Sequence, residues 1–264
     1  MGAVSEFIRE LQSYEEYAFS LQELKRTTKA PESSLRKELS RLANDQQILN
    51  LRKGFYLILP PRYQSYAKLP VGLYVDKLFN FLNKPYYVGF YSAAAQHGAS
   101  HQQIQQDYII TTPPALRDIS KGNMQLRFFN SSRWPSKNIL KRKSDAGYFN
   151  ISSPALTFAD LLENQQQLGG LNRMMAILEE LAENLDEKDV EDLLSWYRNK
   201  SVLQRMGFLL EVISGNENIQ GLLIKFLQEA SFYPTLLNPT KGQKPGSTGN
   251  RWKVDVNLQI ESDL

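Results

Sequence analysis

From residue 20 to residue 59 the chain reads SLQELKRTTKAPESSLRKELSRLANDQQILNLRKGFYLIL. Ser20 and Glu23 have the spacing of a capping box, which predicts that a helix begins there. Pro31 ends that helix, because the residue before a proline is driven out of the α region. Ser33 or Ser34 then offers the N-cap of a second helix. Two short helices joined by a tight turn are expected.

The second helix is predicted to be amphipathic. Leu35, Leu39 and Leu42 share one side at helical spacing, so the opposite side carries basic and small polar residues. Two apolar runs rich in β-formers, Ile48–Arg52 and Phe55–Leu59, follow on either side of Lys53-Gly54 and predict a hairpin with a basic tip. With a short amphipathic helix at 5–14, this is the pattern of a winged helix-turn-helix.

Positive charge is concentrated in this part of the chain. Residues 25–62 hold nine Lys or Arg against three Asp or Glu, whereas the whole chain has a net charge of only +3. A helix that presents cations and hydroxyls can enter a major groove, and a basic wing can lie against phosphate. The residues expected to contact duplex DNA are Thr28, Lys29, Ser33, Ser34, Arg36, Lys37, Ser40, Arg41, Arg52 and Lys53. The alternative is a protein-docking module of the same shape.

Length and composition set limits on the rest. With 264 residues, 42% hydrophobic and 22% charged, the chain is expected to form two domains of an ordinary soluble protein. It has no cysteine, which excludes disulfides and thiolate chemistry. No apolar run approaches the length of a membrane span, and the N-terminus lacks a signal pattern, so a cytoplasmic location without a membrane partner is expected.

The expected fold class is α+β, with the winged helix-turn-helix followed by a mixed α/β region and a helical C-terminal region. Pro60-Pro61 ends the wing, so the domains are predicted as 1–62 and 63–264. The second is predicted to be mixed α/β to about residue 165, then mainly helical with a C-terminal strand. Expected helices are 71–83, 92–98 (capped by Ser92), 154–162 (opened by Ser153), 171–185, 202–213 and 219–230, and expected strands are 108–112, 124–129, 147–151 and 252–260.

No group of residues carries a convincing catalytic pattern. The two histidines, His97 and His101, are separated by Gly98, which should end their helix, so they are not expected to share a metal. Ser92 beside His97 lacks the glycine pattern of a nucleophile elbow, and a helix cap is the preferred interpretation. The loop Lys241–Gly249 lacks the spacing of a phosphate-binding loop. The acidic residues of 179–192 suggest a solvated face. We therefore expect no enzyme, metal or cofactor.

A second basic stretch, RWPSKNILKRK at 133–143, has five cations and no acid. Such a stretch is either a solvated surface or a patch that meets an acidic protein or a nucleic acid. The residues of this possible partner-binding patch are Arg133, Lys137, Lys141, Arg142 and Lys143.

Several segments together resemble the AbiEi family of antitoxins. They are the winged N-terminus with RKGFYLILPP, the small-residue helix GFYSAAAQHG, the strand IITT, the segment GYFNISSPALTFADLL and the tail RWKVDVNLQIESDL. The similarity runs over essentially the full length. By position, the recognition helix would be Ser33–Asn44 and the wing Ile48–Leu59.

The resemblance implies a bacterial antitoxin with two activities. The N-terminal part would repress its own operon, and the C-terminal part would neutralise, directly or indirectly, a nucleotidyltransferase toxin of the AbiEii type associated with abortive phage defence. One winged helix reads only a few base pairs, so paired, inverted sites in its own promoter are expected. The alternative is an operon-specific repressor with a ligand-sensing C-terminal domain, which the gene neighbourhood would distinguish.

Overall fold

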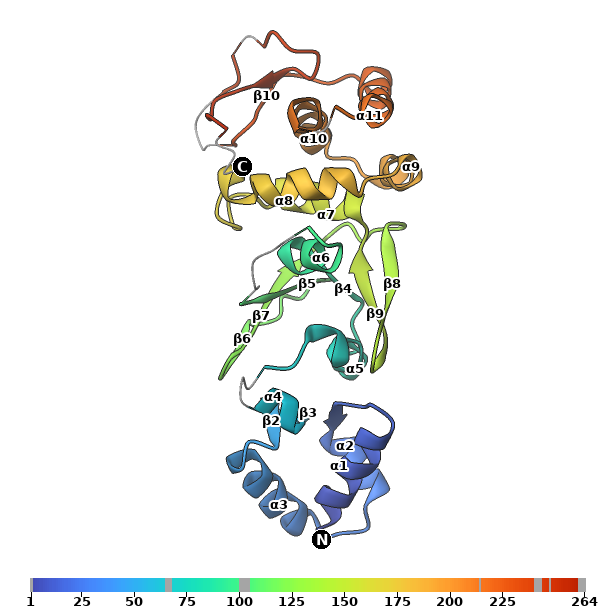
Figure 1. Ribbon diagram of the computed structural model, residues 1–264, viewed down its shortest axis with the longest axis vertical. Coiled ribbons are helices and arrows are strands. Elements are labelled where there is room, and N and C mark those ends of the chain that lie inside the picture. The colour runs from blue at the N-terminus through green and yellow to red at the C-terminus, as the bar shows by residue number, and fades with distance from the viewer. Residues whose placement is uncertain are drawn as a thin grey trace. The chain divides into compact units, whose positions relative to one another are not determined.

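The computed structural model describes residues 2–64, 68–99, 105–213, 215–239, 244–246 and 248–260 (Figure 1). The fold mixes helices and sheets. The chain forms two compact units, and neither is a single continuous segment. Unit 1 consists of Met1–Tyr87, Gln105–Ser132 and Lys141–Asn150, and unit 2 of Val88–Ile104, Arg133–Leu140 and Ile151–Leu264.

Unit 1 begins with what we call the N-terminal module, residues 2–59. Its elements in order are α1 (Ala3–Ser13), β1 (Ala18–Ser20), α2 (Leu21–Thr27), α3 (Glu32–Asn44), β2 (Ile48–Arg52) and β3 (Phe55–Ile58). The strands form an antiparallel sheet in the order β1-β3-β2. The three helices cover one buried cluster that includes Phe7, Leu24 and Leu35. The three helices and the hairpin expected from the sequence are therefore confirmed.

Local hydrogen bonds explain where these helices begin. The Ser20 hydroxyl accepts from the backbone N–H of Glu23 at 3.0 Å and the Glu23 carboxylate accepts from the N–H of Ser20 at 3.3 Å, which confirms the capping box. The prediction that Ser33 or Ser34 caps α3 is wrong. The Pro31 carbonyl already accepts from the N–H of Ser34 at 3.0 Å, so the first turn closes at Pro31 and both serines lie inside the helix.

The remaining elements of unit 1 are short. They are α4 (Pro61–Gln64), the 3-10 turn η1 (Val71–Leu73), α5 (Val75–Leu82), β5 (Asp107–Thr111), β6 (Ile119–Lys121) and β7 (Met124–Asn130). The helix expected at 71–83 is interrupted at Tyr74, whose φ of −143° is not helical, so that only its second part is α-helix. Strands β5 and β7 run parallel, and β6 pairs antiparallel to β7.

A six-stranded sheet has the order β6-β7-β5-β4-β9-β8 (Figure 1). The further strands are β4 (Tyr86–Val88), β8 (Ile139–Ser144) and β9 (Gly147–Ser152). The strands expected at 108–112, 124–129 and 147–151 are confirmed as β5, β7 and β9. Strand β8 was not expected, because its sequence ILKRKS lacks apolar alternation; it is an edge strand, where lysines are common.

Unit 2 is mainly helical. Its helices are α6 (Phe90–Gln96), α7 (Pro154–Glu163), α8 (Leu171–Glu183), α9 (Glu187–Trp196), α10 (Lys200–Ile213) and α11 (Glu217–Ala230), and two short strands, β10 (Thr235–Leu236) and β11 (Val254–Asp255), pair in parallel. Helix α10 contacts both α7 and α11 (Figure 1). The expected cap at Ser153 is confirmed, since its hydroxyl accepts from the N–H of Leu156 at 3.3 Å.

Two expectations in unit 2 are wrong. Ser92 does not cap α6, because the helix begins after Gly89 and Ser92 is buried within it. The strand expected at 252–260 is reduced to β11, since Lys253 takes a positive φ of 52° and Trp252 turns into the helical core instead.

Among the described residues, no helix has the length and apolar character needed to span a membrane. The boundaries of the two compact units differ from those of the expected domains 1–62 and 63–264. The assignment of DNA binding to residues 1–62 and of the antitoxin activity to residues 63–264 stays a prediction.

Candidate functional site

Helix α3 divides cleanly into two faces. Leu35, Leu39 and Leu42 are at most 4% exposed and anchor the helix to the module core. The residues on the other side are exposed: Ser33, Ser34, Arg36, Lys37, Ser40, Arg41 and Asn44. In the part of the chain that the structure describes, no ion pair is formed by Lys37 or Arg41. These two cations are therefore open to a partner.

Arg36 is different, because it is held by an acid. Its guanidinium donates to Glu32 from Nε at 3.0 Å and from Nη2 at 2.6 Å, and the Lys25 ammonium lies 2.6 Å from the other carboxylate oxygen. Hydrogen bonds from Lys25 and then Arg36 lower the pKa of Glu32, so the carboxylate is ionised at neutral pH. Two cations from two helices thus meet one carboxylate at the start of α3.

A second glutamate of α3 faces inward. Glu38 accepts hydrogen bonds from the backbone N–H groups of Val4 and Ser5, both at 3.1 Å, and from the Ser5 hydroxyl at 2.8 Å. Burial raises the pKa of Glu38, but these hydrogen bonds, together with a smaller effect of the Arg41 charge, outweigh burial and the net pKa is lowered. The carboxylate sits where the N-terminus of α1 presents free N–H groups. It fixes α1 against α3 and removes a negative charge from the exposed face.

The turn before α3 and the hairpin complete this surface. Thr28 is half-buried and its hydroxyl donates to the Leu24 carbonyl at 2.8 Å, whereas Lys29 is exposed. At the hairpin tip Gly54 has a φ of 80°, which a glycine adopts without strain, and Lys53 is exposed. Arg52 is only half-exposed, and its buried Nη1 has no acceptor within the part of the chain that the structure describes. Of the two wing cations, Lys53 is the more accessible.

Helix α5 contacts the N-terminal module within unit 1. The Lys77 ammonium lies 2.9 Å from a Glu23 oxygen and also pairs with Glu16. The rings of Phe81 and Phe55 lie 5.2 Å apart, beside Gly54. The same Glu23 that caps α2 is therefore tied to α5.

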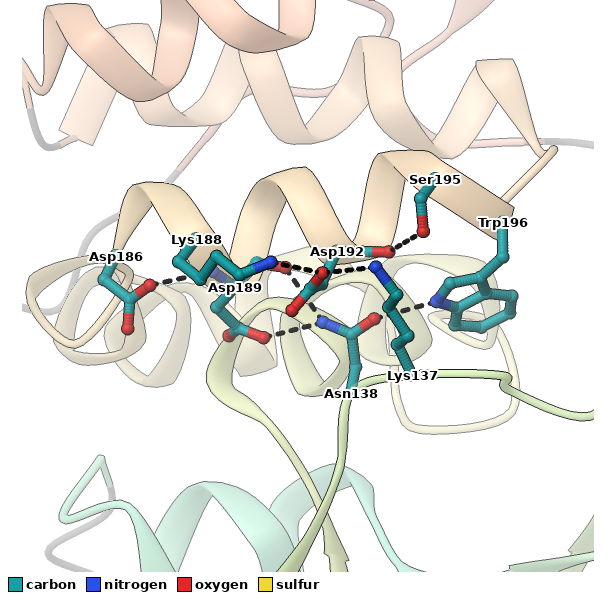
Figure 2. Close-up of polar contacts among 8 residues, drawn as sticks. All are labelled: Lys137, Asn138, Asp186, Lys188, Asp189, Asp192, Ser195 and Trp196. Atoms are coloured by element: carbon teal, nitrogen blue, oxygen red, sulfur yellow. Dashed lines mark hydrogen bonds and ion pairs between the residues drawn. The ribbon is translucent and has the colours of Figure 1, made fainter.

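The second basic stretch is divided between the two units. Arg133 and Lys137 belong to unit 2, and Lys141, Arg142 and Lys143 belong to unit 1. The Lys137 ammonium lies 2.7 Å from Asp192, which Lys188 also contacts at 2.7 Å (Figure 2). Lys137, and then Lys188, lower the pKa of Asp192. The three cations of unit 1 are exposed on the edge strand β8.

A polar junction beside Lys137 joins three segments of unit 2. The Asn138 amide donates to the carbonyl and carboxylate of Asp189 at 2.8 and 2.7 Å and accepts from the Trp196 indole at 2.8 Å (Figure 2). The other Asp189 oxygen accepts from the N–H of Ala155 in the first turn of α7 at 2.7 Å. Because every group is satisfied, this junction fixes α9 against α7 and the segment before β8.

Comparison with known proteins identifies a family for the middle of the chain. Residues 87–212, just under half of the chain, match the family profile described as the AbiEi antitoxin C-terminal domain. These residues belong to the AbiEi antitoxin C-terminal domain family. The match confirms the resemblance stated from the sequence and supports an antitoxin role in a toxin–antitoxin system; the family is not an enzyme family.

The whole fold has a known counterpart. The crystal structure of the Rv2827c protein from Mycobacterium tuberculosis aligns with a TM-score of 0.66 and 16% identity, covering 96% of this chain and 90% of that chain. At this identity the likeness shows the fold alone. No curated protein sequence matches the chain.

The AbiEi domain contains most groups whose chemistry was considered in the sequence. The His97 imidazole lies 2.7 Å from the Ser152 carbonyl, while His101 falls outside the described residues. Four of the nine residues of the Lys241–Gly249 loop, 241–243 and 247, do too. Within the described residues no cluster of three His, Cys, Asp or Glu could hold a metal. The acidic residues of 179–192 lie on α8 and α9, and some serve structure, as Asp189 and Asp192 do.

Sequence reasoning missed the roles of Glu32, Glu38 and Lys77. The pair Glu32 and Arg36 has the i, i+4 spacing of a helical ion pair, so this contact was open to prediction. The contacts of Glu38 and Lys77 join residues more than 30 positions apart, which no local spacing reveals.

Proposed function

We propose that the N-terminal module is a winged helix-turn-helix that binds duplex DNA of its own promoter and represses its own operon. The observation that carries this proposal is the exposed face of α3, where Lys37 and Arg41 stand free among small hydroxyl residues on a helix anchored by buried leucines. A rigid helix with such a face suits a major groove, and Lys53 on the hairpin suits phosphate.

We propose further that the AbiEi domain neutralises a nucleotidyltransferase-type toxin. The family match supports the antitoxin part of this proposal, and the toxin type follows from the resemblance to the AbiEi pairs. The exposed cations Lys141, Arg142 and Lys143 are the proposed patch for an acidic toxin surface, since no ion pair or hydrogen bond joins their side chains to another described residue.

A binding titration tests the DNA-binding proposal. The full chain and the variant K37A/R41A/R52A/K53A are titrated against the duplex upstream of the coding sequence and against random duplex of equal length. Loss of Lys37 and Arg41 should cost sequence discrimination of about 1–3 kcal/mol per base contact, while loss of Arg52 and Lys53 should mainly reduce salt-sensitive affinity. Unchanged binding by the quadruple variant would refute the assignment.

A control for the loss of positive charge uses two lysines elsewhere. Lys121 on β6 and Lys225 on α11 are exposed, so K121A/K225A lowers the net charge without touching the module. This control should retain operator preference. Footprinting of the same complex should show two inverted half-sites, because a single winged helix reads only a few base pairs.

A further inference from the structure

Glu32 is the first residue of α3 and carries an exposed carboxylate in the middle of a basic surface. It is 46% exposed and binds Lys25 of α2 and Arg36 of α3, which are 38% and 68% exposed. An acid at this position opposes the approach of a polyanion. If the module binds DNA, as proposed above, the carboxylate must therefore either lower affinity everywhere or be compensated on the right sequence.

Four of the exposed cations of α2 and α3 fall into two pairs. Lys37 and Arg41 form no ion pair in the part of the chain described, whereas Lys25 and Arg36 share the single negative charge of Glu32 in the free protein. Exposed ion pairs of this type are weak and are screened by salt, so phosphate can replace the carboxylate as their partner. That exchange frees the oxygens of Glu32.

The position of Glu32 decides what the freed oxygens can meet. Residues at the N-terminal end of a recognition helix lie closest to the base edges. In the major groove a carboxylate accepts from the exocyclic amino group of cytosine, which has no negative charge to repel it. Without such a donor the carboxylate faces only phosphates and base acceptors.

We propose that Glu32 is a sequence-discriminating residue of this site. On the operator, Lys25 and Arg36 transfer to phosphates and the carboxylate accepts from a cytosine amino group. On other sequences the carboxylate keeps its cations and repels the duplex. The proposal rests on DNA binding by the module, and it names the base that α3 reads at its N-terminal end.

The test compares E32A with E6A in the full chain. Glu6 is also exposed and lies in the first turn of α1, so both variants lose one acid near a helix N-terminus, but only E32A frees Lys25 and Arg36. Binding is measured to the upstream duplex and to random duplex over a range of salt concentrations. For E32A on random duplex we expect tighter binding and a salt slope steeper by about one to two. We expect its operator preference to fall about tenfold. E6A should match the wild type.

A second part of the test removes the two cations that pair with Glu32. In the background K25Q/R36Q the steeper slope caused by E32A should disappear, since no cation remains to be freed. If the wild type prefers the operator but E32A behaves like E6A, the role of Glu32 is refuted and DNA binding stands. If the wild type shows no preference for the operator, both proposals fail. Thermal melts show whether each variant is folded.

Discussion

Gly207 lies under the ring of Trp252 in unit 2, and no larger residue fits there. A Cβ built at Gly207 would lie 2.1 Å from the indole ring, which is fully buried on α10. The indole N–H donates to Glu211, and Arg251 pairs with the same acid at 2.8 Å. The tail that carries Trp252 is thus a packed part of unit 2.

Gly207→Ala should therefore destabilise the protein although alanine favours a helix. Displacing the indole costs about 1–3 kcal/mol, which exceeds the roughly 1 kcal/mol gained in helix propensity. The matched control is Gly221→Ala in α11, where a Cβ meets no atom of the described residues within 4 Å. Thermal unfolding should show a lower Tm for the first variant and a higher one for the second. Equal shifts would show that Trp252 does not pack on Gly207.

Asp107 at the start of β5 should make stability depend on pH. It is 8% exposed, and one of its oxygens has no hydrogen-bond partner among the described residues. Burial raises its pKa from 3.8 to about 6, and the nearby Lys68 offsets part of this effect. Since the folded pKa is above the unfolded value, the stabilising contribution is complete below pH 4 and is lost as pH rises through 6.

Asp107→Asn removes this penalty. At pH 7.5 the variant should gain up to about 3 kcal/mol in the free energy of unfolding, and the gain should shrink toward pH 4. Chemical denaturation at several pH values measures the difference. Asp45→Asn, which changes an exposed acid of the same unit, is the control. A gain that does not vary with pH would contradict ionisation as its cause.

Residues could be predicted where their partners are close in sequence. The caps at Ser20 and Ser153 depend on a group three residues away, and both are confirmed. The caps proposed at Ser33 or Ser34 and at Ser92 are wrong, because Pro31 and Gly89 start those helices earlier. The hydrogen bond by which Glu38 anchors α1 joins residues 34 positions apart, so no short sequence pattern predicts it.

At the scale of elements, α5 should stabilise the N-terminal module. Lys77 and Phe81 reach Glu23 and Phe55 of the module. Partly exposed ion pairs contribute about 0.2–1 kcal/mol and an aromatic pair about 0.5–1.5 kcal/mol. A fragment of residues 1–84 should therefore be about 1–2 kcal/mol more stable than a fragment of residues 1–62. In the longer fragment K77A/F81A should remove the difference. Equal melts for the two wild-type fragments would mean that α5 is dispensable.

Strand β8 carries the proposed toxin-facing patch on a sheet edge. Reversal of Lys141, Arg142 and Lys143 to glutamate changes the local charge from +3 to −3 without removing an ion pair or side-chain hydrogen bond to any described residue. We expect K141E/R142E/K143E to keep its Tm but to lose protection when it is co-expressed with the cognate toxin. Reversal of Lys121 and Lys225 is the control. If the triple variant still protects cells fully, these cations do not bind the toxin. Their role would then be to keep the edge strand soluble and to prevent it from pairing with another strand.

At the scale of the whole molecule, the order of segments in the sequence does not show which segments fold into the same compact unit. The long helices α8, α10 and α11 were predicted from apolar periodicity, and the hairpin from its glycine turn. The two compact units were not predicted, because unit 1 joins the N-terminal module to residues 105–132 and 141–150. Contacts between residues far apart in sequence bring such segments together: the rings of Phe79 and Phe128 lie 6.1 Å apart, and the Lys84 ammonium donates to the Thr112 carbonyl at 2.7 Å. Proline at 60–61 marks the end of the module without separating it from α5.

This architecture determines how the two proposed activities should be separated. A fragment starting near Gln64 removes the module that contacts Lys77 and Phe81, so a loss of protection would have two causes. Substitution in the full chain avoids this problem. Lys37 and Arg41 are exposed and unpaired among the described residues, so K37A/R41A should fold like the wild type.

We expect K37A/R41A to lose its preference for the upstream duplex, about tenfold or more per lost base contact, and to protect cells from the cognate toxin as well as the wild type does. The reason is that the residues of the AbiEi domain, 87–212, lie wholly outside α3. Both proteins are expressed from an unrelated inducible promoter, because loss of autorepression would otherwise raise the antitoxin level and conceal a weaker protein. K121A/K225A controls for the lost charge. If cells that hold equal amounts of folded K37A/R41A die as they do without antitoxin, protection depends on operator binding and the two activities are one.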